Sequence, residues 1–121
     1  MMKKIILDTN FLIDCAKFRI DFISELKRIC DFKYQMFIVD KTIDELARVK
    51  DKINAKIAQQ FIDKFNIPTI ATKKDKIVDK LILDIVDKDY IIATQDKNLK
   101  KELNQKGILI VFIRNKNYLS F

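Results

Sequence analysis

Short runs of consecutive apolar residues alternate along this chain with stretches in which apolar residues recur every three or four positions. The runs consist mainly of branched side chains without polar alternation, which is typical of strands covered on both faces of a sheet. They predict strands at residues 5–7, 36–39, 67–70, 90–94 and 108–113. The third run contains Pro68, which cannot donate a backbone hydrogen bond and therefore favours an edge position.

The stretches between these runs have the spacing of amphipathic helices. We expect helices over residues 11–18, 20–30, 42–49, 53–65, 75–86 and 97–106, the last ended by Gly107. Strands that alternate with helices indicate a parallel sheet. The predicted fold class is therefore α/β, with three α/β/α layers around a mainly parallel sheet of about five strands. At 121 residues, without a linker or repeat, the chain is expected to form a single domain, residues 1–121.

Composition removes several classes of function. One Gly and one Pro leave no glycine-rich phosphate loop, which excludes Rossmann and P-loop nucleotide binding. The chain has no His, so a catalytic Cys/His pair is excluded, and Cys15 and Cys30 are expected to be core residues. No apolar run approaches the roughly 18 residues of a membrane span, and no signal peptide is visible. We expect a cytoplasmic protein without a membrane partner.

The net charge of +7 favours a polyanionic partner, because Lys and Arg that neutralise phosphates release counterions. Nucleic acid is the expected partner. The alternative is that a lysine-rich surface reflects a lysine-rich or heat-adapted proteome.

Four acidic residues lie where metal ligands are expected. Asp8 and Asp96 follow the first and fourth strands, at the sheet edge where parallel α/β proteins bind ligands. Glu45 lies early in the helix after the second strand, and Asp79 lies at the edge of the apolar arc of its helix. Clustered carboxylates are unfavourable unless cations neutralise them, so the four together predict a divalent metal.

Each acid also has a simpler structural explanation. Asp8 would only favour the N-terminus of a helix that one of the next two residues caps. Glu45 stands three residues after Thr42, which is the spacing of a capping box. Asp79 would pair with a lysine at the helix edge, and Asp96 would be an N-cap.

The ordered motifs at residues 7–13, 42–46, 78–79 and 93–99 resemble the PIN-domain ribonucleases over essentially the whole chain. The resemblance implies a PIN-like domain that uses Mg²⁺ or Mn²⁺. It assigns the catalytic, metal-binding role to Asp8, Glu45, Asp79 and Asp96. The polar residues that it places around them are Asn10, Thr94 and Asn98.

The chain departs from the family pattern at two positions. Asn98 and Lys80 stand where many members carry further acids, which bears on whether one or two metals bind. Residues 110–119 are similar to the archaeal relatives of the PIN endonucleases that process small-subunit ribosomal RNA.

The predicted function is a metal-dependent endoribonuclease that hydrolyses RNA phosphodiester bonds, with precursor ribosomal RNA as the expected substrate. The candidates for RNA contact are Lys97, Lys100, Lys101, Arg114, Lys116 and Tyr118. Their alternative explanation is a solvated helix face and a frayed terminus. Two other functions stay open: a VapC-like toxin ribonuclease silenced by an antitoxin, and a non-catalytic RNA-binding ribosome-assembly factor. Homodimers are common among members of the family, so we also expect that this protein could form one.

Overall fold

The computed structural model describes residues 2–121, which form six strands and six helices. The strands are β1 (Lys3–Leu7), β2 (Tyr34–Val39), β3 (Thr69–Ile70), β4 (Tyr90–Ala93), β5 (Leu109–Arg114) and β6 (Tyr118–Ser120). The helices are α1 (Thr9–Lys17), α2 (Phe22–Ile29), α3 (Lys41–Arg48), α4 (Lys52–Lys64), α5 (Val78–Ile85) and α6 (Lys97–Gln105). Every expected strand and helix has a counterpart, and most differences are shifts of a few residues at the ends.

The strands form one sheet in the order β3-β2-β1-β4-β5-β6. Strands β1 to β5 are parallel, and only β6 runs antiparallel to its neighbour. The central strand β1 pairs on both sides, with Ile5 opposite Met36 of β2 and Ile91 of β4. Strand β3 lies at the edge, as Pro68 predicts. The α/β fold with a mainly parallel sheet is confirmed, with six strands rather than five.

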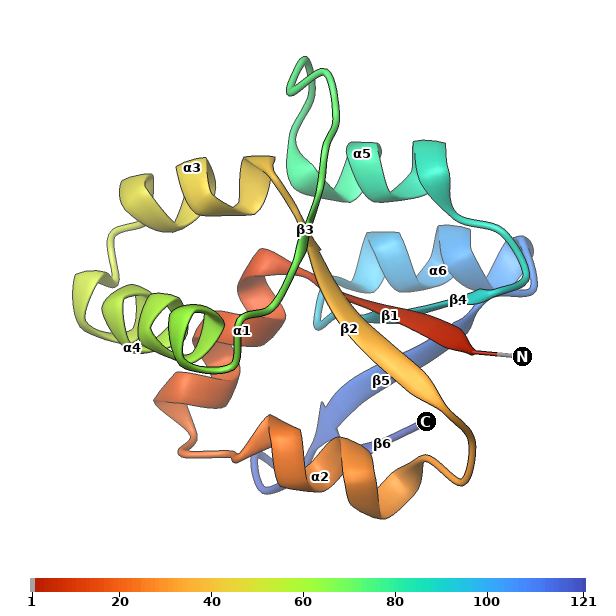
Figure 1. The fold of residues 1–121 in the computed structure, drawn as a ribbon, viewed down its shortest axis with the longest axis horizontal. Coiled ribbons are helices and arrows are strands. Elements are labelled where there is room, and N and C mark those ends of the chain that lie inside the picture. The colour runs from red at the N-terminus through yellow and green to blue at the C-terminus, as the bar shows by residue number, and fades with distance from the viewer. Residues whose placement is uncertain (1) are drawn as a thin grey trace.

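Helices cover both faces of the sheet (Figure 1). Helices α1, α2 and α4 pack on one face, where the core includes Ile5 and Leu7. Helices α5 and α6 pack on the other face, where the core includes Ile6. This alternation explains why an unbroken apolar run forms the central strand, because both of its faces are buried. The three-layer arrangement is therefore confirmed.

The last strand was not expected from the sequence. Arg114 pairs with Tyr118 across a tight turn in which Asn115 and Lys116 have φ of 55° and 53°. Two successive residues with positive φ define the hairpin turn whose twist suits antiparallel strands. The frayed terminus considered for this segment is wrong. The strand is only three residues long and buries only Leu119, so it lacks the apolar run from which a strand could be predicted.

Helix α2 closes the outer edge of β6. The Glu25 carboxylate accepts a hydrogen bond from the Leu119 backbone nitrogen at 2.9 Å. The Arg28 guanidinium donates to the Leu119 carbonyl at 2.9 Å and pairs with Glu25 at 3.0 Å. An acid and a base three residues apart on one helix therefore occupy both backbone groups of a strand residue.

Two helix ends differ from expectation in ways that affect the site. Helix α1 begins at Thr9, with Asp8 itself as the N-cap. Helix α5 begins at Val78 rather than at residue 75, and its N-cap Ile77 has no side chain able to cap it. Helix α6 ends as predicted, because Gly107 follows it with φ of 72°, a conformation that favours glycine.

The two cysteines were both expected in the core, and this prediction is confirmed for Cys15 and wrong for Cys30. Cys15 is buried in the core, and Cys30 is only partly buried. Among residues 2–121, no helix combines the length and the apolar character that crossing a membrane requires.

Candidate active site

Asp8 occupies the end of the central strand and is 5% exposed. One carboxylate oxygen, Oδ1, accepts a hydrogen bond from the Thr9 backbone nitrogen at 2.9 Å. The other, Oδ2, accepts from the Thr94 hydroxyl at 2.7 Å. Asp8 therefore does more than favour the N-terminus of α1, because it caps that helix and is tied to the end of β4.

Burial raises the pKa of the Asp8 carboxyl from 3.8 to about 6. The hydrogen bonds from Thr94 and Thr9 oppose this rise, and the negative charges of Glu45 and Asp79 add to it. Removal from water disfavours the ionised form, and nearby carboxylates disfavour it further. A cation beside Asp8 would reverse both effects.

Glu45 reaches from α3 to the N-termini of two other helices. Its Oε1 accepts a hydrogen bond from the Thr9 hydroxyl at 2.7 Å, and its Oε2 accepts from the Val78 backbone nitrogen at 3.1 Å. The capping box with Thr42 is wrong: Asp40 caps α3, and the Thr42 hydroxyl is buried without a partner in the described chain. Glu45 instead supplies the cap that α5 lacks.

This contact gives a prediction about stability. Glu45→Ala leaves the Val78 nitrogen without an acceptor, whereas Glu45→Gln retains one, and both variants remove the same charge from beside Asp8. We expect Glu45→Ala to be less stable than Glu45→Gln by about 1 kcal/mol, the usual value of an N-cap. Urea denaturation of the two variants measures the difference. Equal stability would show that the carboxylate does not hold α5.

Asp96 caps α6, since its Oδ1 accepts a hydrogen bond from the Leu99 backbone nitrogen at 2.8 Å. Its own backbone nitrogen donates to the Thr94 hydroxyl at 3.1 Å. The Thr94 hydroxyl therefore connects Asp8 with Asp96. The N-cap explanation of Asp96 is correct, and it does not remove the residue from the site, because a capping carboxylate keeps a second oxygen.

Asp79 lies in the first turn of α5 and is half-buried. Its Oδ1 accepts a hydrogen bond from the Lys80 backbone nitrogen at 2.9 Å. Within residues 2–121 it forms no ion pair with a lysine, so the alternative of a paired helix-edge acid is wrong.

The four acids line one cavity of 290 Å³ at the carboxyl edge of the sheet. Its walls are Asp8, Thr9, Asn10, Ile13, Glu45, Val49, Ile77, Asp79 and Asp96. No three acidic side chains of the described chain are arranged so that they could hold a metal ion together as they stand. The structure thus brings the predicted acids to one place, and their roles as ligands stay a prediction.

A second, more polar groove continues from this cavity and shares Asp79 and Asp96 with it. The groove has a volume of 670 Å³, lies between α5 and α6 and includes Asn98 and Lys101. Lys80 of α5 also lines it and pairs with Glu102 of α6 at 3.8 Å. Both residues that depart from the family pattern therefore face the groove.

The other polar candidates have separate positions. The Asn10 side-chain oxygen accepts a hydrogen bond from the Gln95 backbone nitrogen at 3.4 Å, which places it between α1 and the end of β4. Lys97 is exposed in the first turn of α6. Lys100 and Lys101 lie on different sides of that helix, because Lys101 lines the polar groove and Lys100 lines another cavity.

The three candidates at the end of the chain lie in the β5–β6 hairpin. The Arg114 guanidinium lies 5.5 Å from the centre of the Phe112 ring, and the Lys116 ammonium lies 5.7 Å from that of Phe18. Tyr118 is half-buried in β6, with the Arg28 guanidinium 5.9 Å from its ring centre. Their contact with RNA stays a prediction.

Sequence reasoning missed the part played by Thr9 and by the Val78 backbone nitrogen. Thr9 stands between Asp8 and Asn10. Its hydroxyl donates a hydrogen bond to Glu45, which lies on another helix 36 positions later in the chain. Its place inside the first motif was the one available signal. Nothing in the sequence indicates that a backbone nitrogen of α5 binds Glu45.

Comparisons with known proteins agree with this arrangement. The family described as "PIN like domain" matches residues 5–116. Ribonuclease VapC4 of Methanocaldococcus jannaschii is 30% identical over 125 residues, which cover 97% of this chain and 95% of that protein. The PIN domain endonuclease Utp24 has a similar structure, with a TM-score of 0.79 and 27% identity, over 96% of this chain and 88% of that one.

These matches extend over nearly the whole chain and include all four motifs. The chain belongs to the family of PIN-like domains. The two relatives are nucleases by name, one a ribonuclease and the other an endonuclease. The resemblance to the PIN-domain ribonucleases is therefore confirmed.

Proposed function

We propose that this protein is an endoribonuclease that requires a divalent metal ion. The observation that carries the proposal is the single cavity that Asp8, Glu45, Asp79 and Asp96 line at the carboxyl edge of the sheet. The ribonuclease name of the similar VapC4 protein and the net charge of +7 support RNA as the substrate.

The donor atoms fit Mg²⁺ or Mn²⁺, which prefer oxygen ligands. Asp79 and Asp96 each keep one carboxylate oxygen that accepts no hydrogen bond within residues 2–121. Asp8 is buried beside the negative charges of Glu45 and Asp79, and a bound cation would offset the cost of that arrangement. Asp8, Asp79 and Asp96 would hold the ion, and Glu45 would bind it or orient a water.

When bound, the ion would supply the activation of water and the neutralisation of charge that phosphodiester hydrolysis needs. The protein's own residues position the groups around it. Thr94 fixes the orientation of Asp8, and Thr9 fixes that of Glu45. Lys80 and Lys101 of the polar groove would bind the RNA phosphates next to the acids, with Asn98 available to the sugar hydroxyls.

Precursor ribosomal RNA is the substrate that we propose, because residues 110–119 are similar to archaeal relatives of small-subunit ribosomal-RNA-processing PIN endonucleases. The 30% identity to VapC4 keeps a toxin ribonuclease as the alternative, and that function would add an antitoxin partner. The assembly-factor alternative is motivated by Lys80 and Asn98. A homodimer and a cytoplasmic location stay predictions.

The test is cleavage of a structured ribosomal RNA fragment and a transfer RNA by the purified protein with Mg²⁺ or Mn²⁺. We expect cleavage that EDTA abolishes and that added metal restores. Preference for the ribosomal fragment would support processing, and preference for the transfer RNA would support the toxin. Tight RNA binding without cleavage under any metal would contradict the proposal and support the assembly factor.

A further inference from the structure

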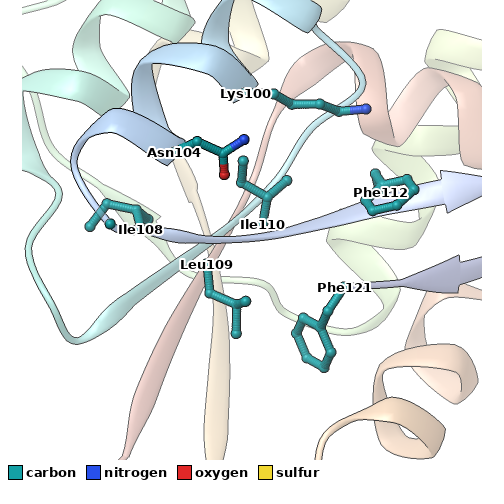
Figure 2. Close-up of a pocket in the computed structure, with 8 residues that line it drawn as sticks. Lys100, Asn104, Ile108, Leu109, Ile110, Phe112 and Phe121 are labelled. Atoms are coloured by element: carbon teal, nitrogen blue, oxygen red, sulfur yellow. The ribbon is translucent and has the colours of Figure 1, made fainter.

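A cavity of 490 Å³ lies on the side of α6 opposite the polar groove, against β5. Its main walls are Lys100, Asn104, Leu109, Ile110, Phe112 and Phe121. Figure 2 shows Lys100 and Asn104 extending from α6 toward β5, with Leu109 and Phe121 on the other side of that strand. The cavity therefore combines apolar and aromatic walls with two polar side chains from one helix.

The apolar wall of this cavity is open to solvent. Leu109 is 48% exposed and Phe121 is 38% exposed, which makes them two of the few large apolar side chains exposed in the described chain. Phe121 makes a tilted aromatic contact with Phe32, with ring centres 6.3 Å apart, so its ring is held in place at the rim. An aromatic ring and an aliphatic side chain around one opening suit a flat ligand.

The polar side of the cavity carries an unpaired positive charge. Lys100 forms no salt bridge with an acid in residues 2–121, and its ammonium lies 4.8 Å from the centre of the Phe112 ring. Burial and the nearby Lys97 lower the pKa of Lys100. The Arg114 guanidinium lies 5.5 Å from the same ring centre. Two cations beside one aromatic ring favour an anionic ligand.

The position of the cavity relates it to the candidate active site. Lys100 and Asn104 stand four and eight residues after Asp96 on the same helix, which places them about 6 and 12 Å along its axis. A stacked nucleic acid strand rises about 3.4 Å per nucleotide. Roughly two to four stacked nucleotides would cover this axial rise. Because the cavity lies on the other side of α6 from the groove that Asp96 lines, an RNA with its scissile phosphate at Asp96 would need further nucleotides to pass around the helix.

We infer that this cavity binds an unpaired nucleobase of the RNA substrate, a few nucleotides from the bond that is cleaved. The base would lie against Leu109 and Phe121, at the open side of the cavity (Figure 2). Lys100 and Arg114 would bind the phosphates that lead to Asp96. The inference rests on the proposed function, since it takes RNA as the ligand. An acidic peptide is the competing occupant. It gives no reason for the cavity to lie on the same helix as Asp96, whereas an RNA substrate does.

The test measures binding of a single-stranded RNA to the full chain in EDTA, so that no cleavage occurs. A series of otherwise identical RNAs carries one abasic nucleotide at each position in turn. We expect wild-type protein to lose at least about fivefold in affinity at one position, as stacking of a base on an aromatic side chain contributes. In Phe121→Ala and Leu109→Ala, affinity for the intact RNA falls similarly, and the abasic substitution has no further effect.

Matched controls separate the cavity from general effects. Ile53 is 76% exposed on α4 and does not line the cavity, so Ile53→Ala removes a comparable exposed side chain elsewhere on the molecule. Lys56→Ala on the same helix is the charge control for Lys100→Ala. Both controls should keep the wild-type dependence on the abasic position, whereas Lys100→Ala should weaken binding and reduce its dependence on salt.

The outcomes distinguish this inference from the proposed function. Equal affinity for every abasic RNA, or an abasic effect that persists in Phe121→Ala and Leu109→Ala, would overturn the base-binding cavity even if the protein cleaves RNA. A position-specific loss that disappears in both variants would support the cavity even if the wild-type protein shows no cleavage with any metal. Competition by an acidic peptide without any abasic effect would assign the cavity to a protein partner.

Discussion

Asp8→Asn is expected to lower RNA cleavage at least about a thousandfold while the fold is retained. The reason is that a neutral amide cannot supply the negative charge that holds a divalent ion, and such ions contribute several kcal/mol to transition-state stabilisation. Asn is as good an N-cap as Asp, so the cap of α1 is kept. Initial cleavage rates at saturating Mn²⁺, with wild-type protein beside the variant, measure the effect.

Asn54→Ala on α4 is a suitable control for this experiment, because Asn54 and its partner Asp51, the cap of α4, do not line the cavity. It should cleave RNA at the wild-type rate. Cleavage by Asp8→Asn within tenfold of wild type would contradict a ligand role for Asp8. The proposal would then need another acid at the centre of the site.

The second large effect concerns stability without metal. The folded pKa of Asp8 is about 6 and its usual value is 3.8, so the folded state binds the proton more tightly. The stabilising contribution is complete below pH 3.8 and is lost as pH rises through 6, which corresponds to roughly 3 kcal/mol. Metal-free Asp8→Asn should lack this loss, and we expect it to be more stable than wild type at pH 7.5.

Thermal denaturation at pH 5 and pH 7.5 in EDTA measures the part of this term that is lost between these two pH values, roughly 1.4 kcal/mol, as the change in the stability difference between wild type and Asp8→Asn. The two proteins should be closer in stability at pH 5, where the wild-type carboxyl is largely protonated. Added Mn²⁺ should stabilise wild type at pH 7.5 and leave Asp8→Asn nearly unchanged. If Asp8→Asn is less stable than wild type at pH 7.5 in EDTA, the hydrogen bonds to Asp8 outweigh the cost of burying its charge, and the prediction is wrong.

Much of the fold could be predicted because its central strands are buried on both faces. Ile5, Ile6 and Leu7 have to be apolar without alternation, and that pattern is visible in the sequence. The start of α5 could not be predicted, because its first backbone nitrogen is bound by Glu45 from another helix. The sequence around residue 75 contains helix-forming residues. It gives no sign that the Val78 nitrogen contacts Glu45, which lies 33 positions earlier.

The candidate site was predictable to the level of which acids meet, because strand ends in a parallel sheet share one edge. The sequence could not show that one residue has two roles at once. From the sequence, Asp96 is either an N-cap or a site residue, and Asp8 is either a site residue or an acid beside a capping residue. The structure makes both of them caps that also line the cavity. Lys100 and Lys101 point to different sides of α6 because successive helical residues are rotated by about 100°. Which cavity each of them lines could be seen only once the neighbours of α6 were known.

The contact of Glu25 and Arg28 with Leu119 has a consequence for self-association. A sheet edge with free backbone groups invites a strand from another molecule, which leads to aggregation or to strand exchange. Here a charged pair already occupies both groups of Leu119, and such a pair holds little attraction for an incoming strand. The β6 edge is therefore closed to fibre growth, and an added strand could pair only with the β3 edge at the other end of the sheet.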